Sequence, residues 1–348
     1  MIFGDDMNCK KPVLRFNDDG KFRVLMISDI HAKDSANPKT VNGIEALVKN
    51  TKPDFVMIGG DQCLNKENLD DIKALFEDFL EPILKRNIPW AAVFGNHDHE
   101  KSIPLEKEFE AYCRIKGFMG EKGPEDISGT GNFVIPVLSS KSERVAYRIW
   151  GLDSHRGHDD TYKAFNLPEN TAVSLPHTKN LIINQSMPYP DQVAWYYNKS
   201  KEFEKQDGKK VPAIMAFHIM LPEFLYVHQN PEQTNCIGNQ RETLDATLFN
   251  SGLFSFALQR GDVKGFFCGH DHLNTLQGEY CGITMALDGA IGYDMSCHDD
   301  LRGGRVIDLF EDGSLQTRMV YLIDLLGKEA FRNPDYFEGG SKYNIRVL

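Results

Sequence analysis

Five short groups rich in histidine, aspartate and asparagine each follow an apolar run of the chain. In chain order they are Asp29-Ile30-His31, Gly60-Asp61, Gly95-Asn96-His97-Asp98, His218 and Gly269-His270-Asp271-His272. Imidazole and carboxylate ligands together favour zinc, iron, manganese or nickel over calcium. One such group is weak evidence, but five groups, each behind a strand, predict a transition-metal site.

Strands and amphipathic helices alternate in the first third of the chain. The apolar spacing predicts strands at 22–27, 54–58 and 90–94, with helices at 41–50, 69–86 and 105–115. This alternation favours an α/β fold with a mostly parallel sheet covered by helices. Because the carboxyl ends of the strands in such a sheet line one crevice, the polar groups behind them should meet there.

The remainder of the chain adds further strands and long polar stretches. Strands are predicted at 133–138, 145–150, 212–217, 263–268, 275–278, 283–287, 305–310 and 315–321, and helices at 190–205 and 248–259. The stretches 157–187 and 222–242 are interpreted as irregular. Long loops in compact domains tend to carry function, so we expect the segments 117–131, 156–187 and 223–242 to surround a substrate pocket.

Composition limits the classes of partner. The 348 residues, 41% of them hydrophobic, fit one large α/β domain or two domains. We interpret the chain as a single domain over 1–348, with a catalytic core at about 20–325. Fifty acidic residues against 39 basic ones leave a net charge of −11, which would repel nucleic acid and anionic membranes. Nucleic acid is therefore disfavoured as a partner.

The cysteines and the N-terminal segment bear on the compartment. Seven cysteines without a CxxC pair predict neither a disulfide framework nor a zinc finger. The first eleven residues do not read as a signal peptide, and no apolar run is long enough to span a membrane. We expect a cytoplasmic protein, although an exported protein whose signal peptide had been removed would look the same. Oligomeric state stays open.

Taken in order, the five groups resemble the calcineurin-like metallophosphoesterases, whose pattern is DxH, GD, GNH(D/E), a lone H and GHxH. The resemblance runs from about Phe22 to Leu287. Within the family, the chain is most similar to the purple-acid-phosphatase-like branch, on the evidence of the GHDH ending, Gly292-Tyr293 and Arg302-Gly303-Gly304-Arg305. That branch has a tyrosine ligand shortly after the GD aspartate, where this chain has Gln62-Cys63-Leu64. A tyrosinate–iron(III) unit is therefore not expected, and iron, manganese and zinc remain open.

The resemblance implies a β-sheet sandwich flanked by helices, in α-β-β-α layers, and two divalent transition metal ions. One ion would be held by Asp29, His31, Asp61 and His272, and the other by Asp61, Asn96, His218 and His270, so that Asp61 bridges the pair. It implies a phosphatase that hydrolyses phosphate monoesters by attack of a metal-bridging hydroxide. His97 would act as the general acid, with Asp98 orienting its ring.

Two other functions fit the same residues. A phosphodiesterase acting on cyclic nucleotides, nucleic acid or lipid head groups would use the same metals. A non-catalytic metal-binding scaffold would keep the fold without turnover. The complete set of expected ligands and the presence of His97 favour an enzyme with a small phosphate-ester substrate.

Several remaining polar residues are predicted to be structural. Asp153-Ser154-His155 imitates a second DxH group, but both metal shells are complete without it, so we interpret it as structural or substrate-side. Arg302 and Arg305 are expected in salt bridges or in solvent rather than on phosphate. The histidines predicted to lie on the surface are His99, His158, His177, His228 and His298.

Overall fold

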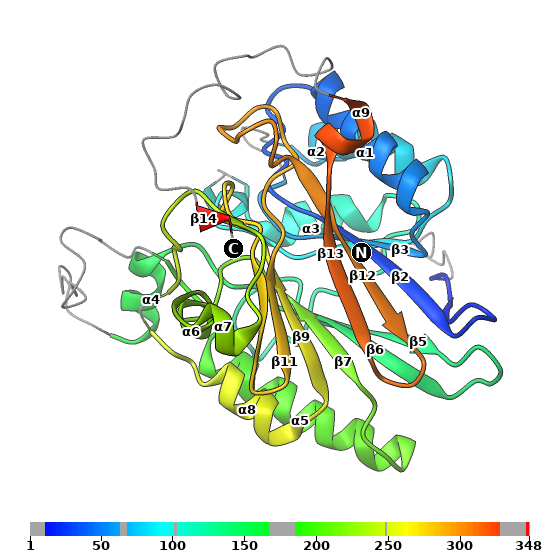
Figure 1. Cartoon of the computed structure of the whole chain (residues 1–348), viewed down its shortest axis with the longest axis vertical. Coiled ribbons are helices and arrows are strands. Elements are labelled where there is room, and N and C mark those ends of the chain that lie inside the picture. The colour runs from blue at the N-terminus through cyan, green and yellow to red at the C-terminus, as the bar shows by residue number, and fades with distance from the viewer. Residues whose placement is uncertain are drawn as a thin grey trace, which may run out of the picture.

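Two β-sheets pack face to face, and helices cover the outer face of each sheet (Figure 1). The computed structural model describes residues 11–62, 68–100, 103–166, 185–247, 249–327 and 346–347. The layering expected from the family resemblance, helix, sheet, sheet, helix, is confirmed.

The first sheet has five strands in the order β13-β12-β2-β3-β4. Its strands are β13 (Leu315–Tyr321), β12 (Gly303–Phe310), β2 (Lys21–Ile27), β3 (Phe55–Ile58) and β4 (Trp90–Ala92). Strands β2, β3 and β4 are parallel, whereas β12 runs antiparallel to β2 and to β13. Its outer face packs on α1 (Pro38–Thr51), α2 (Leu69–Leu84), α3 (Leu105–Cys113) and α9 (Leu322–Leu326).

The second sheet has seven strands in the order β1-β5-β6-β7-β9-β11-β10. They are β1 (Leu14–Arg15), β5 (Phe133–Leu138), β6 (Val145–Gly151), β7 (Ala213–Ala216), β9 (Val263–Cys268), β11 (Ile283–Leu287) and β10 (Gln277–Tyr280). Strands β6, β7, β9 and β11 are parallel, and β5 pairs antiparallel with β6. Its outer face packs on α5 (Pro190–Asp207), α6 (Glu223–Gln229) and α8 (Leu253–Arg260).

Strand β2 illustrates why the central strands are buried on both faces. Phe22, Val24 and Met26 join the core between the two sheets, while Leu25 and Ile27 join the core beneath α1 and α2. Successive side chains of a strand point to opposite faces, so a strand covered on both sides needs apolar residues at nearly every position.

Several predictions of regular structure were wrong in detail. The strands β2, β3 and β4 are parallel as predicted, but both sheets also contain antiparallel pairs. The supposedly irregular stretches contain α4 (His158–Ala164), α6 and α7 (Pro231–Thr234), and residues 167–184 lie outside the described residues. These helices are too short to show a helical period in sequence.

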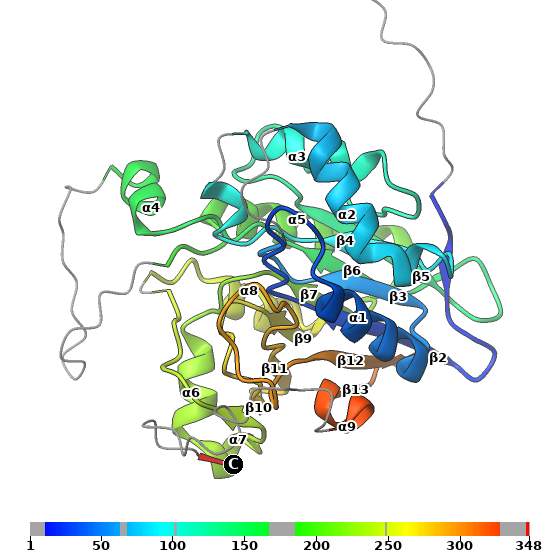
Figure 2. The ribbon, with the colours of Figure 1, turned by 90° about the horizontal axis from the view of Figure 1, so that it is seen from above.

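The peripheral elements lie apart from the main layers. Helix α8 begins at Leu253 rather than 248, directly after Gly252, which adopts a left-handed conformation. A two-stranded ladder joins β8 (Asn239–Gln240) to β14 (Arg346–Val347). Figure 2 shows α4, α6 and α7 on the side of the molecule away from α1 and α2. Within the described part of the chain, every helix is too short or too polar to cross a membrane.

Candidate metal centre

The carboxyl ends of strands from both sheets meet at one site. The loops after β2 and β3 run side by side, since the N–H of Asp29 donates to the carbonyl of Gly60 at 3.1 Å. The loop after β9 joins them, because the N–H of His270 donates to Asp29 Oδ2 at 3.1 Å. His218 arrives from the loop after β7. The five predicted groups therefore converge, as the rule for strand ends predicted.

Four side chains form the first group of possible metal ligands. One atom each from Asp29, His31, Asp61 and His272 lies within 4.8 Å of all the others. The Nε2 atoms of His31 and His272 are 3.0 Å apart, and Asp29 Oδ1 is 3.3 Å from His272 Nε2. Imidazole nitrogens and carboxylate oxygens that converge in this way can share one transition-metal ion.

A second group shares Asp61 with the first. One atom each from Asp61, His218 and His270 also lies within 4.8 Å of the other two. Asp61 Oδ2 is 3.2 Å from His218 Nε2 and 3.5 Å from His31 Nε2, so a single carboxylate oxygen faces both groups. These groups contain the residues that the resemblance assigned to the two ions, except Asn96.

Asn96 lies beside the shared carboxylate. The next residue, His97, donates its backbone N–H to Asp61 Oδ1 at 2.9 Å. The Oδ1 atom of Asn96 is buried and accepts no hydrogen bond from the described residues. An amide oxygen in this position is available as a neutral ligand.

Buried polar atoms without hydrogen-bond partners test whether the site fits metal ions. Among the side chains that the structure describes, Asp29 Oδ1, Asn96 Oδ1, His218 Nε2 and His270 Nε2 are buried and have no such partner. Burying a polar atom without a partner is unfavourable, and buried polar groups are nearly always satisfied. Coordination would satisfy all four atoms, so the donor set fits transition metals.

In His218 and His272 the Nδ1 atom makes a hydrogen bond to the backbone, so that the Nε2 atom is free to face the candidate metal centre. His218 Nδ1 donates to the carbonyl of Gly59 at 2.8 Å, and His272 Nδ1 donates to the carbonyl of Ser296 at 3.0 Å. A second-shell bond of this kind sets the tautomer and the ring orientation of a metal-binding histidine.

The carboxylates and imidazoles of the site shift each other's pKa values. Burial by itself would raise the pKa of Asp29 and of Asp61, but His218 and neighbouring imidazoles lower both well below the usual value. Burial would lower the pKa of His218 and His272, but Asp61 and Asp29 raise the pKa of His218 to about 10, and Asp29 raises that of His272 to about 9. Metal ions would replace the protons on these rings, so metal binding should strengthen as the pH rises.

The backbone of the site is held in conformations that L-residues rarely adopt. The φ angles of Asp29, His31, Asp61 and His270 are 54°, 48°, 53° and 74°. Left-handed non-glycine residues cost about 1–3 kcal/mol each and persist where the surroundings determine them. Here the hydrogen bonds between the three loops supply that constraint.

His97 lies at the rim of the site. Its ring centroid is 5.2 Å from that of His31, and its side chain is 32% exposed. His97 Nδ1 donates to Glu100 Oε2 at 2.7 Å. A ring beside the ligands with access to solvent is suitably placed to exchange a proton.

Asp98 was predicted to orient that ring, and the ring's Nδ1 donates instead to Glu100. The buried carboxylate of Asp98 accepts the backbone N–H groups of Asp61, Gln62 and Gly95, at 2.9, 3.1 and 2.9 Å. The reason is local geometry: in the 3₁₀ turn Asp98–Glu100, residues three apart face each other and adjacent ones do not. Glu100 therefore meets the His97 ring.

The residues predicted to be structural are mostly so. Asp153 and His155 lie outside both ligand groups. Arg302 and Arg305 are buried and donate to backbone carbonyls, and Arg302 also pairs with Asp299. His99 is not a surface residue, since its Nε2 atom lies 3.0 Å from the buried carboxylate of Asp153.

Other histidines predicted to lie on the surface have mixed outcomes. His228 and His298 are half-buried, and His298 accepts a hydrogen bond from Arg241. His177 and the side chain of His158 lie outside the described residues.

Two acidic residues near the site were missed. Glu100 contacts His97, and Asp245 Oδ2 lies 3.5 Å from His270 Nε2. The spacing of three between Glu100 and His97 was an available signal, whereas Asp245 comes from a stretch without a recognisable pattern.

The sequence of this chain is similar to a known family and to several known phosphatases. A family model described as calcineurin-like phosphoesterase matches residues 22–274. The chain is 25% identical over 308 residues to "Probable inactive purple acid phosphatase 14" of Arabidopsis thaliana, covering 80% of this chain and 73% of that protein. It is 25% identical over 291 residues to "Phosphatase DCR2" of Saccharomyces cerevisiae, covering 77% and 46%.

A solved structure shares the fold. The dimetal phosphatase from Danio rerio superimposes with a TM-score of 0.56 at 13% identity, covering 86% of this chain and 95% of that one. Because the family model matches well over half of the residues, the chain belongs to the calcineurin-like phosphoesterases.

Proposed function

We propose that this chain is a dinuclear metal-dependent phosphatase acting on small phosphate monoesters. The observation that carries the proposal is the Asp61 carboxylate, one oxygen of which faces His31 of the first ligand group and His218 of the second. A negatively charged group between two cation sites is the ligand that a metal pair requires. In this proposal Asp29, His31, Asp61 and His272 hold one ion, and Asp61, Asn96, His218 and His270 hold the other.

The metals, when bound, supply positive charge for the phosphate and lower the pKa of water toward neutrality. The chain's own residues do the rest. His97 protonates the oxygen of the departing alcohol, and Glu100 orients its ring through the 2.7 Å hydrogen bond to Nδ1. The Asp61 side chain also fixes the backbone of His97, so the acid keeps its place relative to the ligands.

The metal content and the activity of the purified protein test this proposal. Supplied with Mn²⁺, Zn²⁺ or Fe²⁺, the protein should bind two equivalents per chain and hydrolyse nitrophenyl phosphate faster than bis-nitrophenyl phosphate. D61N should lose both ions and all turnover, because it removes the shared charge. A preference for the diester would instead establish the phosphodiesterase alternative.

A non-catalytic role is the second candidate, and the name of the Arabidopsis relative, which calls that protein inactive, is the observation that favours it. The chain has every expected ligand and also His97, which a scaffold would not need. A protein that binds two equivalents of each metal and hydrolyses neither nitrophenyl ester would be a scaffold. A buried carboxylate at the opposite ends of the strands, Asp262, offers a control for D61N, since D262N should retain both metals.

A further inference from the structure

Residues 153–156, in the loop after β6, contact the turn that follows His97 and the loop that carries His218. We propose that this segment, Asp153-Ser154-His155-Arg156, is a positioning clamp that fixes the His97 turn and the His218 loop relative to each other. The inference rests on the proposed function, because it assigns His97 as the acid. It explains why a motif that imitates a metal-binding DxH group lies outside both ligand groups.

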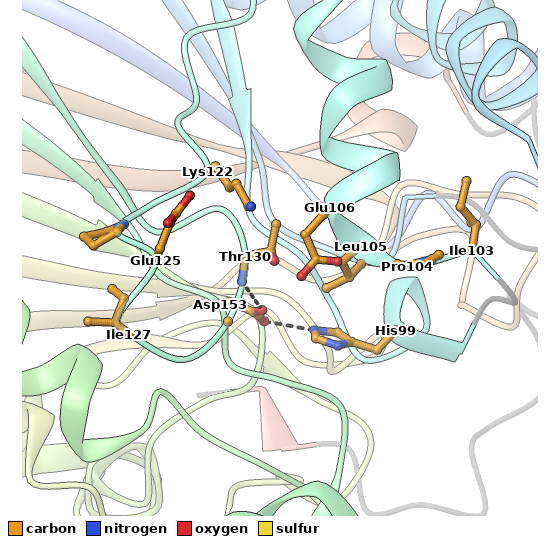
Figure 3. Close-up of a pocket in the computed structure, with 12 residues that line it drawn as sticks. His99, Ile103, Pro104, Leu105, Glu106, Lys122, Glu125, Ile127, Thr130 and Asp153 are labelled. Carbon is orange, nitrogen blue, oxygen red and sulfur yellow. Dashed lines mark hydrogen bonds and ion pairs between the residues drawn. The ribbon is translucent and has the colours of Figure 1, made fainter. Parts of the chain in front are cut away.

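Asp153 anchors the turn that follows His97. Its side chain is fully buried, and Oδ1 lies 3.0 Å from Nε2 of His99 in the turn Asp98–Glu100. Oδ2 accepts the N–H of Thr130 at 2.9 Å, and Figure 3 shows the carboxylate between these two partners. Burial would raise the pKa of Asp153, but the neighbouring His99 and His155 lower it well below the usual value. The carboxylate is therefore charged and holds the imidazole of His99.

Arg156 reaches the same turn from its other side. Its Nε atom lies 3.7 Å from Oε1 of Glu100, while Oε2 of Glu100 accepts the hydrogen bond from His97. Both ends of the segment thus contact residues that flank the acid. Together with the contacts of Asp98 to the Asp61 backbone, all three residues of the turn are tied to other parts of the site.

Ser154 connects the segment to the second ligand group. Its buried Oγ accepts the backbone N–H of Ile219 at 3.0 Å, and Ile219 directly follows His218. A shift of the segment would therefore move the acid turn and the His218 loop together.

His155 fixes the segment itself against α5. Its Nε2 lies 3.0 Å from Oε1 of Gln192, and its ring stacks on Tyr189 with centroids 3.8 Å apart. Gln192 Nε2 donates to the carbonyl of Asp153 at 2.8 Å. His155 has a φ of 60°, which its surroundings must hold in place. The clamp is thus anchored on a helix that contributes no metal ligand.

Positioning, rather than stability, is what such a network best supplies. A buried ion pair adds little net stability compared with apolar residues of similar size. A displacement of about 1 Å in a reacting group, however, can cost about 10²-fold in rate. His99 and Asp153 also line a cavity of about 690 Å³ next to the turn (Figure 3).

D153N tests the clamp, with D262N as the matched control. Asp262 is also a buried carboxylate with two short hydrogen bonds, from Tyr196 and Ser200, but it lies at the opposite ends of the strands. D153N should lower kcat on an alkyl phosphate by about 10²-fold, lower kcat on nitrophenyl phosphate by less than about 10-fold, and keep both metals and KM. D262N should change kcat by the same factor on both substrates. Equal losses on both substrates in D153N would overturn the proposal.

His99 offers a second route if D153N folds poorly. H99Q keeps an N–H donor for Asp153 and should retain most of the alkyl phosphatase activity, whereas H99L should show the same substrate-selective loss as D153N. Similar activity of H99Q and H99L would contradict the clamp.

Amide hydrogen exchange separates this inference from the proposed function. Exchange across residues 95–100 should be faster in metal-loaded D153N than in the wild type, and unchanged in D262N. Unchanged exchange in D153N would overturn the clamp even in an active enzyme. A wild-type protein without activity would refute the proposed function alone, because the exchange measurement needs no turnover.

Discussion

At the residue scale, one carboxylate organises the site by using its two oxygens differently. Asp61 Oδ1 accepts the backbone N–H of His97, while Oδ2 faces His31 and His218. Its own backbone N–H is bound by Asp98. The position of the proposed acid is therefore coupled to the position of the metal-binding oxygen through a single side chain.

Two variants distinguish the role of Glu100, which contacts the His97 ring, from that of Asp98, which holds the backbone of the ligand loops. E100Q should lower turnover of alkyl phosphates about 10-fold with little change on nitrophenyl phosphate, because only the acid step depends on the His97 ring. D98N should instead lower metal occupancy and cost about 1–3 kcal/mol in the free energy of unfolding, because it weakens the acceptor of three backbone N–H groups. Metal analysis and urea unfolding of both variants check this, and loss of metal in E100Q would contradict it.

At the element scale, short loops after parallel strands must approach each other closely to bring the ligands together. Gly95, which follows β4, has the backbone and side chain of Asp61 directly where a Cβ would be. Gly60, with a φ of 105°, has the ring of His218 in the corresponding place. Glycine at these two positions is needed for space, and at Gly60 also for its backbone conformation.

G95A should displace Asp61 and thereby lower the occupancy of both metal sites. G208A is its control: Gly208 ends α5 in a left-handed conformation and has open space around it. G208A should cost about 1–2 kcal/mol in the free energy of unfolding through backbone strain alone and keep both metals. Metal counting on the two purified variants distinguishes them, and full occupancy in G95A would show that the loop can relax.

At the scale of the whole molecule, the site depends on how the two sheets are held together. Arg305 belongs to β12 of the five-stranded sheet, is fully buried, and donates to atoms of the seven-stranded sheet and the loop beside it. Its partners are Leu287 O at 2.6 Å, Gln277 Oε1 at 2.6 Å and Thr275 O at 3.1 Å. Burial lowers the pKa of Arg305 to about 10, so the guanidinium stays charged at neutral pH.

R305M should lower the free energy of unfolding by about 3–5 kcal/mol, because it leaves several buried acceptors without a donor. R318M is the matched control, since Arg318 lies exposed on the neighbouring strand β13 and its loss should be within about 0.5 kcal/mol. Urea denaturation of both variants measures the difference. A loss for R305M no larger than that for R318M would mean that the apolar interface alone holds the sheets.

The sequence by itself determined the longer strands, and it identified the polar side chains that meet at their carboxyl ends. Apolar runs such as 22–27 and 263–268 report burial directly, and the rule that strand ends share one crevice then brings Asp29 and His270 together without further information. The residue types predict a site for transition metals rather than for calcium, because ligand preference is a property of the donor atoms.

Only the tertiary structure decided which side chains hold the ligands in place. Asp153 meets His99, and Asp245 meets His270, across long stretches of chain, and such contacts depend on how loops from different layers pack. The antiparallel strands in the two sheets have the same origin, whereas the contact of Glu100 with His97 is local and follows from their spacing of three. A hydrophobic period shows which face of a helix or strand is buried. It does not show which polar side chain of another element will contact a given residue.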